Sequence, residues 1–283
     1  MRLQRPLALH TSIRVGGPAA YFVEPANVEA LARALDFAHA RGLPWYVLGN
    51  GTNTLFSDEG FPGVVIHLGP GGGLSNLSWR EGTLHAGAGA SLAAARHTCS
   101  QNGCGALDAL VGVPASVGGA LAMNAGVPEG TVGALVLCVT ALDPLGNIVE
   151  LDQKACEFGY RSSRLRSEGF VVLSARLRCD TPARCDLSAL SERRRGQPLG
   201  NSFGCTFKNP AGGAQSAGWM IERCGLKGFR VGDAQVSRAH ANFILNRGKA
   251  NCADILTLID IVRERVYKEF SLELHLEVEV VTK

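Results

Sequence analysis

Residues 45–53 read Trp45-Tyr46-Val47-Leu48-Gly49-Asn50-Gly51-Thr52-Asn53, and this stretch predicts a strand that runs directly into a glycine-rich loop. Small residues in this order let successive main-chain N–H groups turn toward one point, which makes a nest for an anion. Thr52 and Asn53 add side-chain donors suited to a pyrophosphate. The loop is neither G-x-G-x-x-G nor a Walker loop, and Asn-Gly pairs also occur in ordinary turns, so both interpretations stay open at this point.

A second glycine-rich stretch lies further along the chain. It reads Gly112-Val113-Pro114-Ala115-Ser116-Val117-Gly118-Gly119-Ala120 and is followed by Asn124-Ala125-Gly126. Its glycines permit close approach of the backbone to a flat or anionic ligand, and Pro114 would stiffen the entry. The alternative is a well-packed loop under a helix. Two such loops in one half of the chain favour a bound dinucleotide more than either loop does alone.

Hydrophobic periodicity and capping residues predict the main elements around these loops. Helices are expected after Asn27, after Ser91 and over 251–270, and a polar, basic stretch at 180–198 is the best candidate for a domain boundary. Strands are expected at 64–68, 83–90, 135–142 and 148–151, with a half-buried strand at 272–280. The middle of the chain is therefore mainly β, and a long helix followed by a strand ends it.

Composition excludes several classes of protein. The chain has 283 residues, of which 46% are hydrophobic and 19% charged, so it is globular rather than intrinsically disordered. The net charge of +3, with no long basic run, gives no indication of nucleic-acid binding. No apolar run approaches the length of a membrane span and no leader is recognisable, so we expect a cytoplasmic protein.

The nine cysteines predict neither a disulfide framework nor a metal site. Their number is odd, no C-x-x-C spacing occurs, and no paired histidine ligands accompany them. Most of these thiols are therefore expected to be small core residues.

Three further segments carry side chains that chemistry could use, although each also has a simple structural interpretation. They are Tyr160-Arg161-Ser162-Ser163, Gly204-Cys205-Thr206-Phe207-Lys208-Asn209-Pro210, and the polar face of 272–280 with Glu273, His275, Glu277 and Glu279. An arginine fork pairs well with a carboxylate, and the second segment groups a proton donor, a cation and an amide. A surface arginine, a buried thiol at a strand end and solvated carboxylates are the alternatives, and periodicity cannot choose among the four polar residues of the last segment.

Taken together, these stretches resemble the MurB family, flavoenzyme reductases of bacterial peptidoglycan synthesis. The resemblance covers nearly the whole chain, and the order of its motifs is specific. Besides the segments already quoted, it rests on Thr11-Ser12-Ile13-Arg14-Val15-Gly16-Gly17, Leu226-Lys227-Gly228, His240-Ala241-Asn242-Phe243 and Leu274-His275-Leu276-Glu277-Val278.

The resemblance implies an α+β architecture with an FAD-binding portion of the PCMH type, made of two subdomains, and a carboxy-terminal α+β substrate domain. We place the subdomains at 1–45 and 46–185 and the substrate domain at 186–283. It also implies two half-reactions. NADPH reduces FAD, and reduced flavin then passes hydride from N5 to C3 of UDP-N-acetylglucosamine enolpyruvate, while an enzyme acid protonates C2 to give UDP-N-acetylmuramate.

By resemblance, Arg161 supplies positive charge at the substrate's carboxylate, where an enolate-like intermediate forms. Glu277 would lie at the same carboxylate and act either from a protonated state or by holding Arg161 or a water molecule in place. The proton donor departs from the family pattern, because Cys205 stands where the family usually has serine. A thiol, with a reference pKa of about 8.5, is a stronger acid than a hydroxyl and can donate a proton to an enolate. We therefore predict that Cys205 takes the role of the serine, and that the enzyme is sensitive to oxidants and alkylating agents.

The remaining site residues are carried over in the same way. Substrate binding is expected at Lys208, Asn209, Lys227 and His240, although Lys227 could equally be a solvated turn residue. FAD binding is expected at Gly49, Asn50, Gly51, Thr52, Asn53, Pro114, Ala115, Ser116, Gly118, Gly119, Gly126 and Val172. The expected partner is a small sugar nucleotide, and a monomer is favoured. The chain resembles the shorter subtype, which lacks an extra tyrosine-bearing segment over the substrate.

Two rival functions are kept. Another PCMH-type flavoprotein, an oxidase of sugars or hydroxy acids, often tethers flavin through a histidine near the phosphate loop, and no histidine falls between Pro44 and Ile66. A non-catalytic nucleotide-binding module predicts that Arg161, Cys205 and Glu277 do not converge in space.

Overall fold

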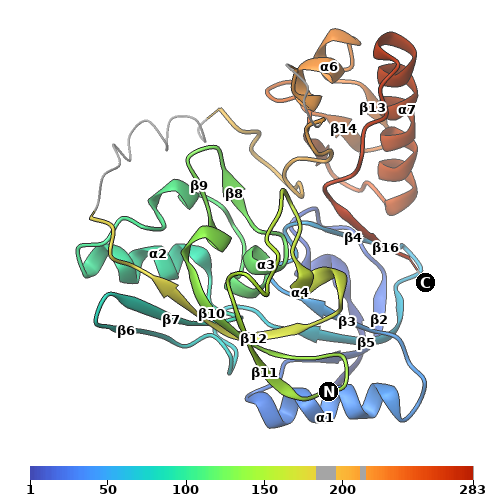
Figure 1. The fold of residues 1–283 in the computed structure, drawn as a ribbon. Helices are drawn as coiled ribbons and strands as arrows, with labels where there is room; N and C mark the ends of the chain where they lie inside the picture. The colour runs from blue at the N-terminus through green and yellow to red at the C-terminus, as the bar shows by residue number, and fades with distance from the viewer. Residues whose placement is uncertain (183–195, 211–214, 283) are drawn as a thin grey trace. The chain divides into compact units, whose positions relative to one another are not determined.

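The computed structural model describes residues 1–182, 196–210 and 215–282 (Figure 1). Its α-helices are α1 (Val28–His39), α2 (Leu92–Gln101), α3 (Val117–Ala122), α4 (Arg164–Ser167), α6 (Ala217–Arg223) and α7 (Cys252–Phe270). Short 3-10 helices are η1 (Leu7–His10), η2 (Asp108–Leu110) and η3 (Val132–Leu135). No helix in these ranges combines the length and the apolar character that crossing a membrane requires.

Within the described residues the strands form five sheets. The first half of the chain contains β1 (Arg2–Pro6), β2 (Pro18–Val23), β3 (Trp45–Leu48), β4 (Thr54–Phe56), β5 (Phe61–His67), β6 (Leu77–Arg80), β7 (Thr83–Gly87), β8 (Gly126–Val127), β9 (Gly130–Thr131) and β10 (Val136–Leu142). The second half contains β11 (Ile148–Asp152), β12 (Val171–Arg178), β13 (Arg230–Val231), β14 (Ala234–Val236), β15 (Ile244–Asn246) and β16 (Glu279–Val281). The sheet orders are β1-β2-β5-β3, β11-β10-β12-β7-β6, β13-β14-β15, β16-β4 and β8-β9.

The chain divides into two compact units that are not continuous in sequence. Unit 1 consists of Met1–Arg2, Phe22–Asn50 and Gly63–Arg194, and unit 2 consists of Leu3–Tyr21, Gly51–Pro62 and Arg195–Lys283. The sequence predicted three continuous domains, at 1–45, 46–185 and 186–283, whereas each of these units combines separate segments of the chain. The three domain ranges stay a prediction. The expected boundary stretch 180–198 lies mostly outside the described residues.

Unit 1 is built on the antiparallel sheet β11-β10-β12-β7-β6 (Figure 1). Helix α2 contacts β6 and β7 of this sheet, and α3 contacts β12 and β7. The hairpin between β10 and β11 forms because the Asp143 carboxylate accepts hydrogen bonds from the main-chain N–H groups of Leu145 and Asn147, at 2.9 and 2.8 Å. These bonds lower the pKa of Asp143, with Asn147 as the largest cause. The expected strands at 135–142 and 148–151 are thereby confirmed with small shifts of their ends.

Unit 2 has its own apolar core around α7. Its inward face carries Ile255, Leu258, Ile259, Val262 and Val266, all 1% exposed or less. Three residues from distant segments, Ile13, Val15 and Leu55, belong to the same cluster. The core of unit 2 therefore depends on parts of the chain far from its carboxy-terminal segment.

The three expected helix starts are confirmed. The side chains of Asn27, Ser91 and Asn251 each accept a hydrogen bond from the main chain three residues later. Such caps satisfy N–H groups that the first turn of a helix leaves unpaired.

The strand expected at 272–280 is wrong over most of its length. Only Glu279–Val281 pairs as a strand, in parallel with β4, while Leu276 makes an isolated bridge to Phe207. The alternation nevertheless identifies the inward side chains. Leu274 and Val278 are buried, and Leu272 and Leu276 pack against the core of unit 2. Alternation alone did not reveal that most of this segment lacks a continuous partner strand.

Candidate active site

The first glycine-rich loop begins in unit 1 with Gly49 and Asn50, which lie against the second one. The Asn50 side-chain amide donates to the carbonyl oxygen of Pro114 at 2.9 Å. A Cβ atom at Gly49 would lie 2.4 Å from the Ser116 hydroxyl oxygen, so any side chain there would displace that hydroxyl. The two glycine-rich stretches, far apart in sequence, therefore meet in unit 1 as a dinucleotide site would require.

These residues fit the expected FAD on two observations. The Oδ1 atom of Asn50 is buried and has no hydrogen-bond partner among the described residues, although buried polar atoms normally have one. The close approach of Gly49 to the Ser116 side chain also brings the two glycine-rich stretches together beside Asn50. A buried acceptor without a partner among the described residues, at the point where two glycine-rich stretches pack together, suits a flavin nucleotide.

The same loop continues in unit 2 from Gly51 to Asn53. Gly51 has φ +61°, and a Cβ atom there would lie 2.0 Å from the carbonyl oxygen of His10. The Asn53 side chain donates to the carbonyl oxygen of Glu277 at 3.0 Å, and the Asn53 carbonyl accepts from Glu279 N–H at 2.9 Å. Asn53 therefore joins the loop directly to the segment that carries Glu277, a role that the sequence did not suggest.

The second glycine-rich stretch is partly helical. Ser116 begins α3, accepting from Gly119 N–H at 3.2 Å, so Gly118 and Gly119 lie in the first turn of a helix rather than in a loop. Gly118 N–H donates to the carbonyl oxygen of Ala88 at 2.8 Å, and a Cβ atom at Gly118 would lie 3.0 Å from the Cβ atom of Ala88.

Val172, which is expected near the flavin ring, is buried in β12.

Arg161 is held in an unusual backbone conformation. Its φ is +52°, a left-handed value that costs a non-glycine residue free energy and is often found at functional sites. The guanidinium donates to the carbonyl oxygen of Gly126 at 2.9 Å and lies over the ring of Tyr160. Gly126 and Arg161, which the sequence assigned to cofactor and catalysis separately, are thus in contact.

Asn124 fixes the segment that carries Arg161, and the sequence analysis did not assign it a role. Its buried side chain donates to the Gly159 carbonyl at 2.8 Å and accepts from Gly133 N–H at 3.1 Å, while its own φ is +43°. Ser163 adds a hydrogen bond to the Ala122 carbonyl at 2.8 Å. The sequence Asn124-Ala125-Gly126 could have indicated this role, because asparagine tolerates a left-handed φ and its side chain forms hydrogen bonds with nearby main-chain groups.

Cys205 and Glu277 lie on neighbouring segments of unit 2. Glu277 N–H donates to the carbonyl oxygen of Thr206, the residue after Cys205, at 2.9 Å. Cys205 also makes an isolated bridge with Phe243, and its side chain is partly exposed. Of the four polar residues that periodicity could not separate, Glu277 is the one whose backbone bonds directly beside the thiol.

Asn242 organises the segment after Cys205, and sequence reasoning did not assign it either. It is 3% exposed, and its side chain accepts from Phe207 N–H at 2.9 Å and donates to the Phe207 carbonyl at 2.8 Å. A third bond joins the Asn242 carbonyl to Thr206 N–H at 2.8 Å. The amide thus replaces a strand partner and keeps the thiol-bearing segment in place.

The expected substrate residues fall into two groups within unit 2. Lys208 donates its main-chain N–H to His275, and the Asn209 side chain accepts from Ala217 N–H at 3.0 Å. Lys227 forms an ion pair with Glu222 at 2.7 Å. Burial lowers the pKa of His240, with the nearby Lys227 as a smaller cause.

Comparison with known proteins decides the family. Residues 197–281 match the carboxy-terminal domain of UDP-N-acetylenolpyruvoylglucosamine reductase, and residues 19–152 match an FAD-binding domain. The reductase of Heliobacterium modesticaldum is 41% identical over 98% of this chain and 90% of its own length. That of Moorella thermoacetica is 42% identical over 97% and 91%.

The chain belongs to the MurB family.

Structural comparison agrees. The MurB crystal structure from Thermus caldophilus matches with a TM-score of 0.83 and 37% identity, covering 98% of this chain and 97% of that one. Cholesterol oxidase from B. sterolicum matches with a TM-score of 0.50 and 18% identity over 61% of this chain, which shows a shared fold only. The expected α+β class with a PCMH-type FAD-binding portion and a further carboxy-terminal domain is thereby confirmed, and the protein is a flavin-dependent oxidoreductase of the MurB family.

Proposed function

We propose that this MurB protein reduces UDP-N-acetylglucosamine enolpyruvate to UDP-N-acetylmuramate with NADPH as the electron donor, in the synthesis of peptidoglycan precursors. The observation that carries the proposal is the pairing of the Cys205 and Glu277 segments, since Glu277 N–H bonds to Thr206 at 2.9 Å in a chain of this family. Paired segments that carry a thiol and a carboxylate suit the protonation of a carbanion next to a carboxylate.

FAD, when bound, supplies the hydride that adds to the enolpyruvyl double bond. The residues proposed to hold it are those of the two glycine-rich stretches, led by Gly49, Asn50 and Ser116, whose close packing supports the assignment.

Each of the three catalytic residues has a distinct role in this proposal. Arg161 places fixed positive charge at the substrate carboxylate, where negative charge develops as hydride arrives at C3. Cys205 donates a proton from Sγ to C2 and is left as a thiolate, which regains a proton from solvent. Glu277 orients the carboxylate or a water molecule beside it.

The substrate's nucleotide and sugar are assigned to Lys208, Asn209, Lys227 and His240. Lys227 is the strongest of these on chemical grounds. Its side chain is 30% exposed, and its ammonium group can exchange the ion pair with Glu222 for one with a phosphate of the substrate. A cytoplasmic monomer remains our expectation for the whole protein.

The test is an anaerobic flavin titration. The purified protein, reconstituted with FAD, is mixed with NADPH while the visible flavin band is followed, and UDP-N-acetylglucosamine enolpyruvate is added afterwards. We expect the band to bleach with NADPH and to recover with one equivalent of the sugar nucleotide.

Two other outcomes contradict the proposal. Recovery of the band only after oxygen is admitted indicates an oxidase, the rival enzyme class. The lack of any flavin signal after addition of FAD contradicts the cofactor assignment itself. Substituting NADH for NADPH in the first step measures the nicotinamide preference directly.

A further inference from the structure

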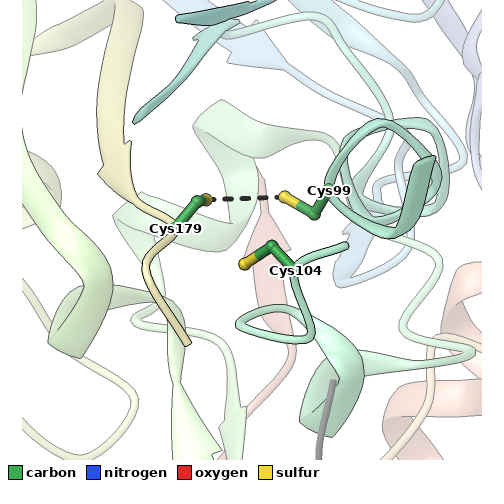
Figure 2. A group of neighbouring side chains, drawn as sticks. All are labelled: Cys99, Cys104 and Cys179. Carbon is green, nitrogen blue, oxygen red and sulfur yellow. Dashed lines mark hydrogen bonds between the residues drawn. The ribbon is translucent and has the colours of Figure 1, made fainter. Parts of the chain in front are cut away.

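Three cysteines that are scattered in the sequence meet in the interior of unit 1. Cys99 lies near the end of α2, Cys104 lies in the loop that follows, and Cys179 comes directly after β12 (Figure 2). Their exposed fractions are 0%, 4% and 3%. The Sγ atoms of Cys99 and Cys179 are 3.5 Å apart, and all three sulfurs lie within 4.8 Å of one another.

We propose that Cys99, Cys104 and Cys179 form a binding site for one soft divalent metal ion of the zinc class. This site shares no residue with those assigned to FAD, to the sugar nucleotide and to catalysis, and it does not depend on the proposed reaction.

The spacing of the sulfurs suits such an ion. With a zinc–sulfur bond of about 2.3 Å, two thiolates of a tetrahedral site are about 3.8 Å apart. The observed 3.5 Å and the 4.8 Å limit bracket that separation, so small side-chain rotations bring all three sulfurs to one centre. Three thiolates leave one coordination position to a donor outside the cluster.

Main-chain N–H groups already point at the sulfurs. Ala106 N–H donates to Cys104 Sγ at 3.3 Å. Cys104 has a further main-chain hydrogen bond with Thr181, and Cys179 has one with Leu84. Hydrogen bonds of this kind orient and stabilise metal-bound thiolates.

The backbone around the cluster is also fixed. Cys104 N–H bonds to the Cys99 carbonyl at 3.0 Å, Gly105 N–H to Thr181 at 3.0 Å, and Cys179 N–H to Gly82 at 2.8 Å. The three sulfurs are therefore presented by segments whose positions are set independently of any ion, which lowers the entropy lost on binding.

Charge favours a divalent over a monovalent ion. On binding, three S–H bonds break, three metal–sulfur bonds form, and up to three protons pass to solvent with no change in oxidation state. Three thiolates leave a net charge of −1 around zinc(II) but −2 around copper(I), and the larger buried charge costs more.

The primary test is the metal content of the full-length protein. Reduced, chelator-treated protein is exposed to zinc(II), both as native protein and during refolding, then dialysed exhaustively and analysed by mass spectrometry for metals. We expect one zinc per chain, and a loss of at least tenfold in retained zinc for each of Cys99→Ala, Cys104→Ala and Cys179→Ala. Cys156→Ala is the matched control, since Cys156 is fully buried in unit 1 but outside the cluster.

A second measurement guards against variants that simply fail to fold. Zinc added to the wild-type protein is expected to raise the unfolding midpoint by about 5 to 10 °C at a hundredfold excess over its dissociation constant. Cys104→Ala, if folded, has a midpoint that zinc does not change, and a pH indicator then records proton release from the wild type alone.

Several results overturn the proposal. One is the absence of bound zinc in both the native and the refolded wild type. Another is equal zinc retention in all variants, which places the ion elsewhere. Binding of copper(I) but not zinc(II) by the reduced protein also contradicts it. So does a protein that binds no zinc and that forms only a Cys99–Cys179 disulfide on oxidation by peroxide.

Discussion

At the scale of single residues, the thiol at position 205 is the most informative. A thiol and a hydroxyl can both donate a proton from nearly the same place, while a methyl group cannot. We expect Cys205→Ala to slow reoxidation of reduced flavin by the sugar nucleotide by about 10²- to 10⁴-fold, the usual worth of a positioned acid. Stopped-flow spectroscopy measures this step.

The control for Cys205 is internal to the same experiment. Reduction of the flavin by NADPH should remain within about twofold of wild type in Cys205→Ala, because no proton reaches C2 in that step. Cys205→Ser should retain most of the second step. Reoxidation of the alanine variant at the wild-type rate would show that another group is the acid.

His240 gives a prediction about pH. Burial lowers its pKa in the folded protein below 6.5, and its Nδ1 accepts from Asn242 N–H at 3.2 Å, so the folded state favours the neutral ring. The unfolded chain therefore binds more protons as pH falls through 6.5 toward the folded value, and stability is lost in that window. His240→Asn, which keeps an acceptor, should lose less stability than wild type between pH 7.5 and 5.5 in urea titrations.

The exposed His97 provides the comparison for that measurement. Because His97→Asn also removes a histidine, the comparison separates the effect of burial from that of the substitution itself. If His240→Asn follows wild type, the neutral buried ring is not what makes the fold sensitive to acid.

At the scale of elements, α7 begins with two caps from different parts of the chain. Asn251 forms a capping box with Asp254, and the Asp58 carboxylate accepts from Cys252 and Ala253 N–H at 2.8 and 3.2 Å. A carboxylate at this end is also favoured by the helix dipole. Asp58→Ala should lower the free energy of unfolding by about 1 to 2 kcal/mol.

Chemical denaturation measures this effect, and Asp260→Ala is the matched control. Asp260 is an exposed carboxylate in the middle of the same helix, where its replacement should change stability by less than about 0.5 kcal/mol. Equal effects of the two substitutions would contradict a capping role for Asp58.

The glycine-rich loop supplies the second prediction at this scale. A Cβ atom at Gly49 would displace the Ser116 hydroxyl, which caps α3, so one added methyl group disturbs both halves of the proposed cofactor site. We expect Gly49→Ala to weaken FAD binding at least tenfold, measured by fluorescence on titration with FAD. Gly130→Ala, whose Cβ meets only Ala109 at an ordinary 3.7 Å, should bind FAD as wild type does.

At the scale of the whole molecule, unit 2 is assembled from three separate segments. Among the strands that the structure describes, β16 pairs with β4 alone, and Ile13, Val15 and Leu55 complete the core around α7. A fragment of residues 196–283 lacks β4 and these three core residues. We expect this fragment to show no cooperative unfolding transition by circular dichroism, whereas the intact chain does. A sigmoidal transition in the fragment would show that the continuous substrate domain expected from the sequence folds alone.

Local signals predicted much of this molecule correctly. The caps Asn27, Ser91 and Asn251 and the Asp143 hairpin depend on residues close in sequence, so their patterns determined the elements directly. The order of short motifs likewise determined the family, because each motif preserves a local backbone geometry.

Only the tertiary structure decided which distant residues meet. Several side-chain hydrogen bonds join segments that no periodicity relates. They are the bond from Asn53 to Glu277, the bonds of Asn124 and Asn242 to the main chain, and the second cap of α7 by Asp58. The same holds for the cysteines, whose spacing predicted no metal site although the fold brings three sulfurs within 4.8 Å. The chain's sequence determined elements and family through local backbone preferences, while these constellations required long-range packing, which places side chains by burial and hydrogen bonding rather than by their order in the chain.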